Sequence, residues 1–342
     1  MKWNKTILVA ATMLFVFCAC TKNENYNPPV FPEERKIEGI CIAENLLISY
    51  AYGMCVDNNY VYVLALSDKK WVQVYDKNTG LHLGSFVGQG RGPGEVSMAE
   101  SITLSKDGKY ISVYDQAQRR LVTYAVSGLE EMPLLSYEKD VSFSLVDGAV
   151  RNAWPLGNYL LVNGQLGIQD GNPKRFQLLE NNQVVNEYND YPVDAREQQL
   201  AFLSPQVCFS PSLEKMATGI FYGGILETFH LADGAISSTG IYKFYEPLVN
   251  WKSGAPKPEA GMRYGFSSMC ATEDLIYTVL IGDEDPNKLN HISVFDWNGL
   301  GIAKYYTEQL VFKLAAIKDE IYALTFEPSE GFSLYKYNGT KR

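Results

Sequence analysis

Six tight turns recur along the chain, each after a short strand-like segment and before a segment rich in β-branched or aromatic residues. The turns are Asp57-Asn58-Asn59, Lys106-Asp107-Gly108, Gly157-Asn158, Ser212-Leu213-Glu214, Glu273-Asp274 and Lys318-Asp319. Successive turns lie about 45 to 60 residues apart, which is near the length of a four-stranded propeller blade. The spacing predicts one repeat array of six units rather than several unrelated domains.

The sixth unit is shorter than the others. Units one to five have room for four strands joined by hairpin turns, but the sixth has room for only three. A propeller has to close its ring, because open sheet edges between its first and last blades promote aggregation. The segment from Lys36 to Ala43 is free to supply the missing strand. We therefore predict an all-β fold over 36–342, a six-bladed β-propeller of four-stranded antiparallel blades closed by an N-terminal strand.

Small residues stand shortly before five of the six turns: Cys55, Thr103, Cys208, Cys270 and Ala316. Inner strands of a propeller crowd toward its axis, where close packing demands small side chains. The third unit departs from this pattern, because Trp154 and Pro155 stand there. Four cysteines follow residue 20: Cys41, Cys55, Cys208 and Cys270. An even number of cysteines in an exported protein suggests disulfides, but the apolar neighbours of these residues favour buried thiols.

The first 20 residues have the pattern of an export signal. Lys2 and Lys5 precede an apolar stretch over 7–17, which is too short to span a bilayer. The following Phe17-Cys18-Ala19-Cys20 resembles the lipobox of bacterial lipoproteins, with Cys20 as the lipidated residue. Phe17 stands where leucine is usual, so lipidation of Cys18 and a soluble secreted form stay open. The polar, proline-containing residues 21–35 predict a flexible tether.

Composition excludes one class of partner. Hydrophobic residues make up 46% of the chain and aromatic residues 13%, which is ample for a buried core. The formal charge is −9, and it becomes −11 when Lys2 and Lys5 are removed with the export signal. A surface this acidic repels phosphate backbones, so we predict no nucleic-acid partner.

A glycine-rich run, Gly88-Gln89-Gly90-Arg91-Gly92-Pro93-Gly94-Glu95, joins the first unit to the second. Its four glycines and one proline indicate a sharply turned connection. No helix follows, so a nucleotide-binding loop is not indicated. With this run, the chain from Lys36 to Gly339 resembles the TolB-like six-bladed propeller lipoproteins of Bacteroides-type bacteria, and more distantly NHL-repeat blades. The resemblance implies a lipid-anchored protein of the cell envelope, in the outer membrane of a diderm bacterium, with a binding role.

Polar residues near the starts of the inner strands form the predicted ligand-binding site. They are Arg91, Glu95, Glu100, Arg151, Asn152, Gln206, Arg263 and Tyr264. Arginine is well suited to binding a carboxylate, so a pocket for a polar or anionic group is indicated. Propeller enzymes resembling lactonases hold calcium with oxygen ligands in the same region, and Glu95, Glu100, Asn152 and Gln206 could act so here. An ordinary solvated rim is the competing interpretation.

The functional hypothesis is a monomeric binding scaffold whose partner is a peptide, a protein or a small exported ligand. The alternative is a channel-centred hydrolase or lyase, with or without calcium. No catalytic residue, resident metal or other cofactor is assigned. The three histidines, His82, His230 and His291, fall on predicted outer strands, and no nucleophile elbow is present.

Overall fold

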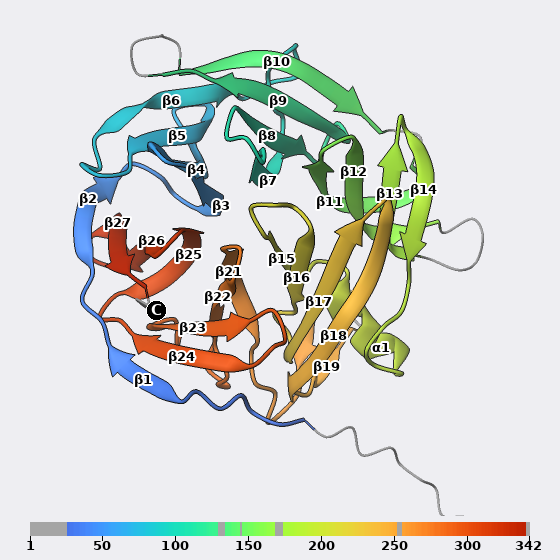
Figure 1. Ribbon diagram of the computed structural model, residues 1–342. Helices are drawn as coiled ribbons and strands as arrows, with labels where there is room; N and C mark the ends of the chain where they lie inside the picture. The colour runs from blue at the N-terminus through green and yellow to red at the C-terminus, as the bar shows by residue number, and fades with distance from the viewer. Residues whose placement is uncertain (1–25, 129–133, 144–145, 168–173, 252–254, 340–342) are drawn as a thin grey trace, which may run out of the picture.

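The computed structural model describes residues 26–128, 134–143, 146–167, 174–251 and 255–339. Six sheets of the described residues surround a common axis as the blades of a propeller (Figure 1), and a seventh has only two strands. Each blade has four antiparallel strands, so the predicted six-bladed β-propeller is confirmed. The predicted export signal and Cys20 lie outside the described residues.

The blades follow one another along the chain. Blade 1 holds β3 (Ala51–Val56), β4 (Tyr60–Ser67), β5 (Lys70–Asp76) and β6 (His82–Gly88). Blade 2 holds β7 (Ala99–Leu104), β8 (Tyr110–Asp115), β9 (Arg120–Val126) and β10 (Leu135–Ser142). Blade 3 holds β11 (Gly148–Leu156), β12 (Tyr159–Leu166), β13 (Lys174–Glu180) and β14 (Gln183–Tyr188). Blade 4 holds β15 (Gln206–Phe209), β16 (Lys215–Gly219), β17 (Gly224–Ala232) and β18 (Ala235–Tyr245). Blade 5 holds β21 (Phe266–Ala271), β22 (Leu275–Leu280), β23 (His291–Asp296) and β24 (Gly301–Tyr306). Blade 6 holds β25 (Leu310–Ile317), β26 (Glu320–Glu327) and β27 (Gly331–Asn338).

The first strand of each blade lies innermost and the last lies outermost (Figure 1). We call the end of the axis where the inner strands begin the entry face, and the end where they reach the six predicted turns the exit face. The second strands are apolar on both sides, because each is covered by a neighbouring blade on either side. In β4, for example, the six residues from Tyr60 to Ala65 are all buried.

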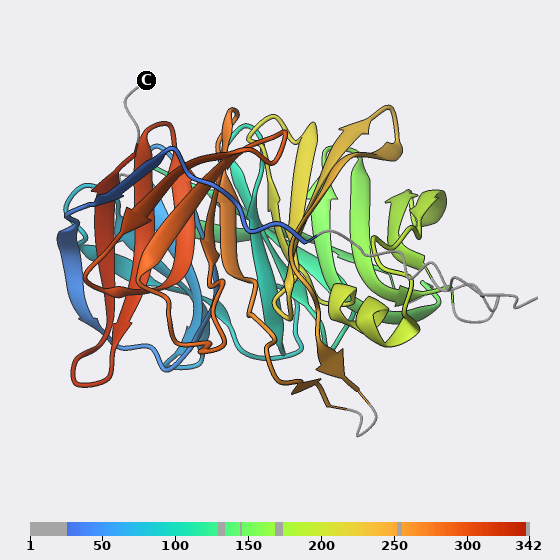
Figure 2. The same ribbon diagram turned by 90° about the horizontal axis from the view of Figure 1, so that it is seen from below.

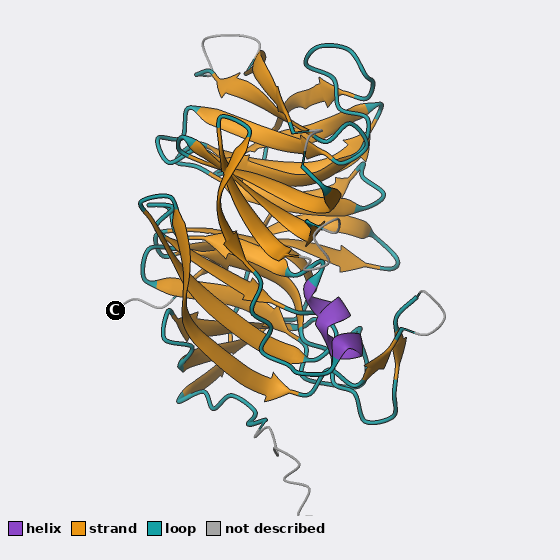
Figure 3. Ribbon diagram, turned by 90° about the vertical axis from the view of Figure 1, so that its right-hand side faces the viewer, coloured by secondary structure: helices purple, strands orange, loops and turns teal. Residues whose placement is uncertain are grey.

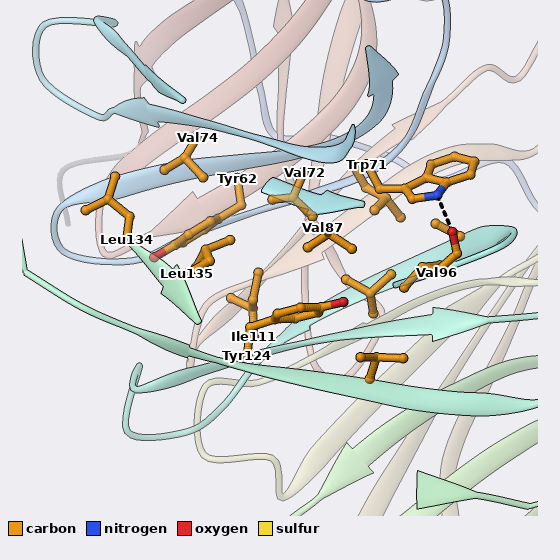
Figure 4. Close-up of a cluster of buried hydrophobic side chains, with 14 of the residues drawn as sticks. Tyr62, Trp71, Val72, Val74, Val87, Val96, Ile111, Tyr124, Leu134 and Leu135 are labelled. Atoms are coloured by element: carbon orange, nitrogen blue, oxygen red, sulfur yellow. Dashed lines mark hydrogen bonds between the residues drawn. The ribbon is translucent and has the colours of Figure 1, made fainter. Parts of the chain in front are cut away.

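Apolar side chains fill the spaces between blades. Figure 4 shows the cluster between blades 1 and 2, where Tyr62 and Val72 face Ile111 and Tyr124. The Trp71 indole N–H donates a hydrogen bond of 2.8 Å to the backbone oxygen of Val96, so this large side chain is buried without an unpaired donor.

The ring is closed by the N-terminal segment, as predicted. Strand β2 (Ile40–Leu46) pairs antiparallel with β27 and becomes the outermost strand of blade 6. The predicted strand began at Lys36, whereas the pairing with blade 6 begins at Ile40. Closure therefore joins the two ends of the described chain through main-chain hydrogen bonds.

The prediction of a flexible tether over 21–35 is wrong for its last part, because residues from Asn27 onward are bound to the propeller. Strand β1 (Glu33–Lys36) adds a fifth strand to blade 5 and runs parallel to β24, with Glu33 opposite Ala303. Before it, the Phe31 ring packs 5.3 Å from that of Phe295, and the Asn27 N–H donates to the Lys243 oxygen at 2.9 Å. The segment is polar because it covers an exposed sheet edge, which needs few apolar side chains.

Two connections on the entry face are longer than the rest. The one from blade 3 to blade 4 contains α1 (Arg196–Gln199) and the short 3-10 helix η2 (Leu200–Phe202), drawn in purple in Figure 3. The one from blade 4 to blade 5 contains the hairpin of β19 (Val249–Asn250) and β20 (Lys257–Pro258), which projects from the disc (Figure 2). Within the described part of the chain, no helix is long and apolar enough to cross a membrane.

Candidate functional site

A β-bulge recurs near the start of five inner strands. The pairing of β3 with β4 skips Tyr52, and the pairing of β7 with β8 skips Glu100. The corresponding residues of β11, β21 and β25 are Arg151, Ser267 and Phe312. In blade 4, β15 begins later, at Gln206, and pairs without interruption. Bulges redirect side chains and are frequent beside functional sites.

The bulges lie at one level of the propeller. Each bulged residue stands three positions before a residue that lines a cavity of about 330 Å³ along the axis, as Tyr52 precedes Cys55 and Arg151 precedes Trp154. The predicted small residues, Cys55, Thr103, Cys208, Cys270 and Ala316, all line this cavity. All five therefore face the axis, which their variable spacing from the turns left open in the sequence, and in blade 3 Trp154 takes the equivalent place.

The axial cavity itself offers little chemistry. The four described cysteines are free thiols, and three of them line the cavity. Burial raises the pKa of the Cys208 thiol to about 12, and it also raises the pKa values of the Cys55 and Cys270 thiols. Protonated, buried thiols are poor nucleophiles, so these cysteines act as small packing residues.

The five bulged residues form what we call the mouth ring: Tyr52, Glu100, Arg151, Ser267 and Phe312. They occupy equivalent backbone positions, yet no two of them are alike. Two are aromatic, one is acidic, one is basic and one carries a hydroxyl group. The mouth ring is thus chemically asymmetric, with its aromatic members on blades 6 and 1 and its charged members on blades 2 and 3.

Aromatic rings gather at the blade 6 and blade 1 side of the mouth. The Tyr50 ring lies edge-on to Tyr52 at 5.0 Å and to Phe312 at 5.4 Å. Behind them, Tyr52 contacts Trp71 at 5.8 Å. Tyr50 keeps 48% and Tyr52 37% of its surface exposed, so this aromatic wall still presents apolar area to solvent.

Three charged groups of the mouth, Glu100, Arg151 and Lys313, interact electrostatically. Burial raises the pKa of the Glu100 carboxyl, while Lys313 and then Arg151 act against that rise. Lys313 follows the bulge in β25, and burial lowers its pKa to about 8 despite the attraction of Glu100. Within the described residues, none of the three makes a side-chain hydrogen bond or an ion pair within 4.0 Å.

Arg91 and Glu95 belong to the glycine run and not to the mouth ring. The Glu95 carboxylate folds back into the run and accepts a hydrogen bond of 2.9 Å from the Gly92 N–H. A Cβ atom at Gly90 would lie 2.1 Å from Glu95 Oε2, which explains the glycine there. Arg120 holds the run from outside by donating to the Glu95 backbone oxygen at 2.6 Å. Arg91 is exposed.

The other predicted residues lie at three places. Asn152 and Gln206 are partly buried near the starts of β11 and β15, beside the mouth ring level. Arg263 lies over the Tyr245 ring at 5.5 Å, and Tyr264 contacts the Phe221 ring at 5.1 Å. The structure therefore brings Glu100 and Arg151 together, whereas Arg263 and Tyr264 join a separate aromatic cluster on the blade 4 to blade 5 connection.

Sequence reasoning missed five residues of the mouth: Tyr50, Tyr52, Ser267, Phe312 and Lys313. A signal for two of them was present, because these members of the mouth ring stand three positions before the small residues that the sequence placed at the axis. Alignment of the inner strands on Cys55, Thr103 and Cys270 would have identified Tyr52, Glu100 and Ser267. The bulge that turns this position toward the mouth leaves no mark in the sequence.

The donor set at the mouth does not suit a calcium ion. Calcium prefers six to eight oxygen ligands with several carboxylates. Here the only carboxylate of the mouth ring stands beside two cations, Lys313 and Arg151. Among the described residues there is no group of three or more His, Cys, Asp and Glu side chains placed to hold a metal ion.

A separate hollow of about 930 Å³ lies on the exit face across blades 2, 3 and 4. Its lining includes Tyr110, Pro155, Tyr159, Leu213 and His230. None of the predicted site residues lies in it. It is larger than the axial cavity and is the chief competing location for a ligand.

Comparison with solved structures supports the fold. A protein from Bacteroides fragilis, described as a candidate exported protein, is similar with a TM-score of 0.59 and 13% identity, covering 91% of this chain and 99% of that one. A DUF4221 family member from Bacteroides vulgatus is similar with a TM-score of 0.53 and 11% identity, covering 88% of this chain and 98% of that one. Regucalcin from Agrobacterium tumefaciens, described as a calcium-binding protein, is similar with a TM-score of 0.50 and 10% identity, covering 90% of this chain and 97% of that one. At these identities the similarity concerns the fold alone.

No curated protein sequence matches the chain. The model of one protein family does match, over residues 43–248, which is more than half of the chain. The matched residues run from β2 through blade 4, and they include the glycine run and three members of the mouth ring. The chain therefore belongs to the DUF5128 family of 6-bladed beta-propeller proteins.

Proposed function

We propose that the protein is an exported, lipid-anchored propeller that binds a peptide, a protein or a small exported ligand at the entry end of its axis. The observation that carries the proposal is the mouth ring. Five inner strands repeat the same bulge, and each places a different side chain there.

The internal repeat argues that packing does not dictate these side chains. At the axial level below, all five predicted packing residues are cysteine, threonine or alanine, in line with a crowded axis, and only blade 3 departs with Trp154. At the mouth ring the same backbone environment holds tyrosine, glutamate, arginine, serine and phenylalanine. Side chains that are free to vary and are partly exposed are suited to recognition.

Export and anchoring rest on the sequence pattern over 1–20 and on the resemblance to TolB-like propeller lipoproteins. The position of β1 adds a restriction to this proposal. Asn27 is already bound to Lys243, so at most about 25 Å of extended chain separates Cys20 from the propeller. We expect the disc to stay close to the membrane with blades 4 and 5 nearest the anchor. Cys20→Ser is expected to release the protein from membranes into the soluble fraction, and full retention would contradict the anchor.

The binding proposal is tested by retention of compounds from an envelope extract, identified by mass spectrometry. The mouth variant carries Tyr52→Ala, Arg151→Gln and Phe312→Ala. The matched control carries Lys106→Gln and Tyr110→Ala in the exit-face hollow. We expect compounds retained by the natural protein to be lost from the mouth variant and kept by the control. Loss from the control alone, or equal retention by all three proteins, would refute the proposal.

A further inference from the structure

The charges of the mouth ring and its neighbours do not cancel. Arg151 and Lys313 each carry a positive charge, and Glu100 carries one negative charge between them. Elsewhere in the molecule comparable groups are paired: Arg120 contacts Asp140 at 2.8 Å and Lys77 contacts Glu320 at 2.9 Å. The mouth therefore keeps one surplus positive charge in a chain whose formal charge is −9.

This surplus selects the charge of a ligand. Arginine and lysine have unused donors at the mouth, which favours an anion. Glu100 would repel a group with two negative charges, such as a phosphate monoester, whereas a carboxylate carries only one. A monocarboxylate would neutralise the surplus and satisfy the guanidinium of Arg151 by paired hydrogen bonds.

The aromatic wall selects the rest of the ligand. Tyr50, Tyr52 and Phe312 pack edge to face at 5.0 and 5.4 Å, and none of the three side chains is buried. Partly exposed aromatic surface gains most by covering a flat apolar group. The Lys313 Nζ lies 5.8 Å from the Phe312 ring centroid, so the wall adjoins one of the two cations.

The geometry points to a monocarboxylate that carries an aromatic ring as the ligand class of this mouth. The ring lies against Tyr50, Tyr52 and Phe312, and the carboxylate lies between Arg151 and Lys313. This inference rests on the proposed function and adds the chemistry of the ligand to it. Glu100 limits the charge that the mouth accepts.

Fluorine NMR of three probes that share one ring tests the inference. The probes are para-trifluoromethyl phenylacetate, the matching benzylamine and the matching benzyl alcohol. We expect the natural protein to broaden the fluorine signal of the acid and to leave the signals of the amine and the alcohol unchanged. Arg151→Gln or Phe312→Ala is expected to weaken its binding about tenfold or more, since a charge-assisted hydrogen bond or an aromatic contact is lost. Glu100→Gln is expected to strengthen it, and Lys106→Gln on the exit face to leave it unchanged.

The other outcomes separate this inference from the proposed function. Broadening of the amine or the alcohol that depends on Phe312 would overturn the ligand class and keep a binding site at the mouth. Broadening of the acid that survives both mouth substitutions would place the acid elsewhere and overturn the inference. Absence of broadening for all three probes would overturn it as well. Circular dichroism melting of each variant establishes that loss of binding is not loss of fold.

Discussion

Lys313, a charged residue of the mouth, lowers the stability of the folded protein. Its ammonium group is partly buried and has no ion pair within 4.0 Å among the described residues. Burial lowers its pKa from 10.5 to about 8, so the folded protein holds the charged form less readily than the unfolded chain does. A group that costs stability without improving packing is characteristic of functional sites.

Lys313→Met is therefore expected to stabilise the protein at pH 7 by about 1–3 kcal/mol. The lysine pKa is lower in the folded state, so its cost is full below about pH 8 and falls as pH rises toward 10.5. Urea unfolding at pH 7 and near pH 10.5 measures both values, with Lys318→Met as an exposed control. A variant that is less stable than the natural protein at pH 7 would contradict this account.

His291 is a polar side chain with a purely structural role. It lies buried on β23, and its Nε2 is 2.6 Å from the Leu280 oxygen. Burial lowers its pKa to about 4. The sequence indicated a structural part for this residue, because outer strands lie away from the axis.

At the level of elements, the glycine run is a folded loop that Glu95 holds from inside. The Glu95 carboxylate occupies the space that side chains at positions 90 and 92 would need. Tyr124 and Arg120 of β9 fix the loop from outside through the backbone oxygens of Gly94 and Glu95. The run is thus a structural motif that joins blade 1 to blade 2.

This arrangement predicts a coupling between two positions. Gly90→Ala is expected to destabilise the natural protein by about 1–2 kcal/mol, because the new methyl group displaces the Glu95 carboxylate from the Gly92 N–H. In a Glu95→Ala background the same change should cost much less. Denaturant unfolding of the four proteins measures the coupling, and Gly128→Ala, where a Cβ meets nothing within 4 Å, is the control. Equal costs in both backgrounds would refute the loop interpretation.

Blades were predictable from the sequence, but the bulges within them were not. Turns such as Lys106-Asp107-Gly108 have residues that specify their geometry, so the strand order follows from them. A bulge adds one residue at a strand start and needs no particular side chain there, as the contrast between Tyr52 and Glu100 shows. For that reason the sequence led to Glu100 and Arg151 and missed their aromatic neighbours.

The N-terminal segment was also predicted only in part. The strand that closes blade 6 was expected, because a three-stranded last blade requires a partner. Strand β1 was not expected, since it lies parallel to an outer edge and buries little apolar surface, with the pattern of one partly buried and three exposed residues. Prolines at positions 28, 29 and 32 precede it and gave the whole segment the composition of a linker.

For the whole molecule, β2 and β1 should differ in importance. A chain that begins at Glu38 lacks β1 but keeps β2, and we expect it to fold with a melting temperature lowered by roughly 5 °C. A chain that begins at Leu47 leaves the edge of β27 open, and we expect it to aggregate or to lose cooperative melting. Thermal melting and light scattering compare the two. A soluble, cooperatively melting protein without β2 would contradict closure by this strand.

The exit-face hollow is the counterpart of the mouth at the other end of the molecule. It is larger, at about 930 Å³, and it is lined by residues of blades 2 to 4. Its lining mixes lysines with carboxylates, as in Lys106, Asp107 and Glu138, and it contains no member of the mouth ring. Binding at the mouth and binding in the exit-face hollow would therefore place a ligand at opposite ends of the axis.

A crystal structure of the protein with a compound retained from the envelope extract tests the central claim most directly. We predict electron density for the compound at the entry face, in contact with Arg151 and Phe312. Density in the exit-face hollow beside Tyr110 and His230, or no density at the mouth at saturating ligand, would contradict a recognition site built by the mouth ring.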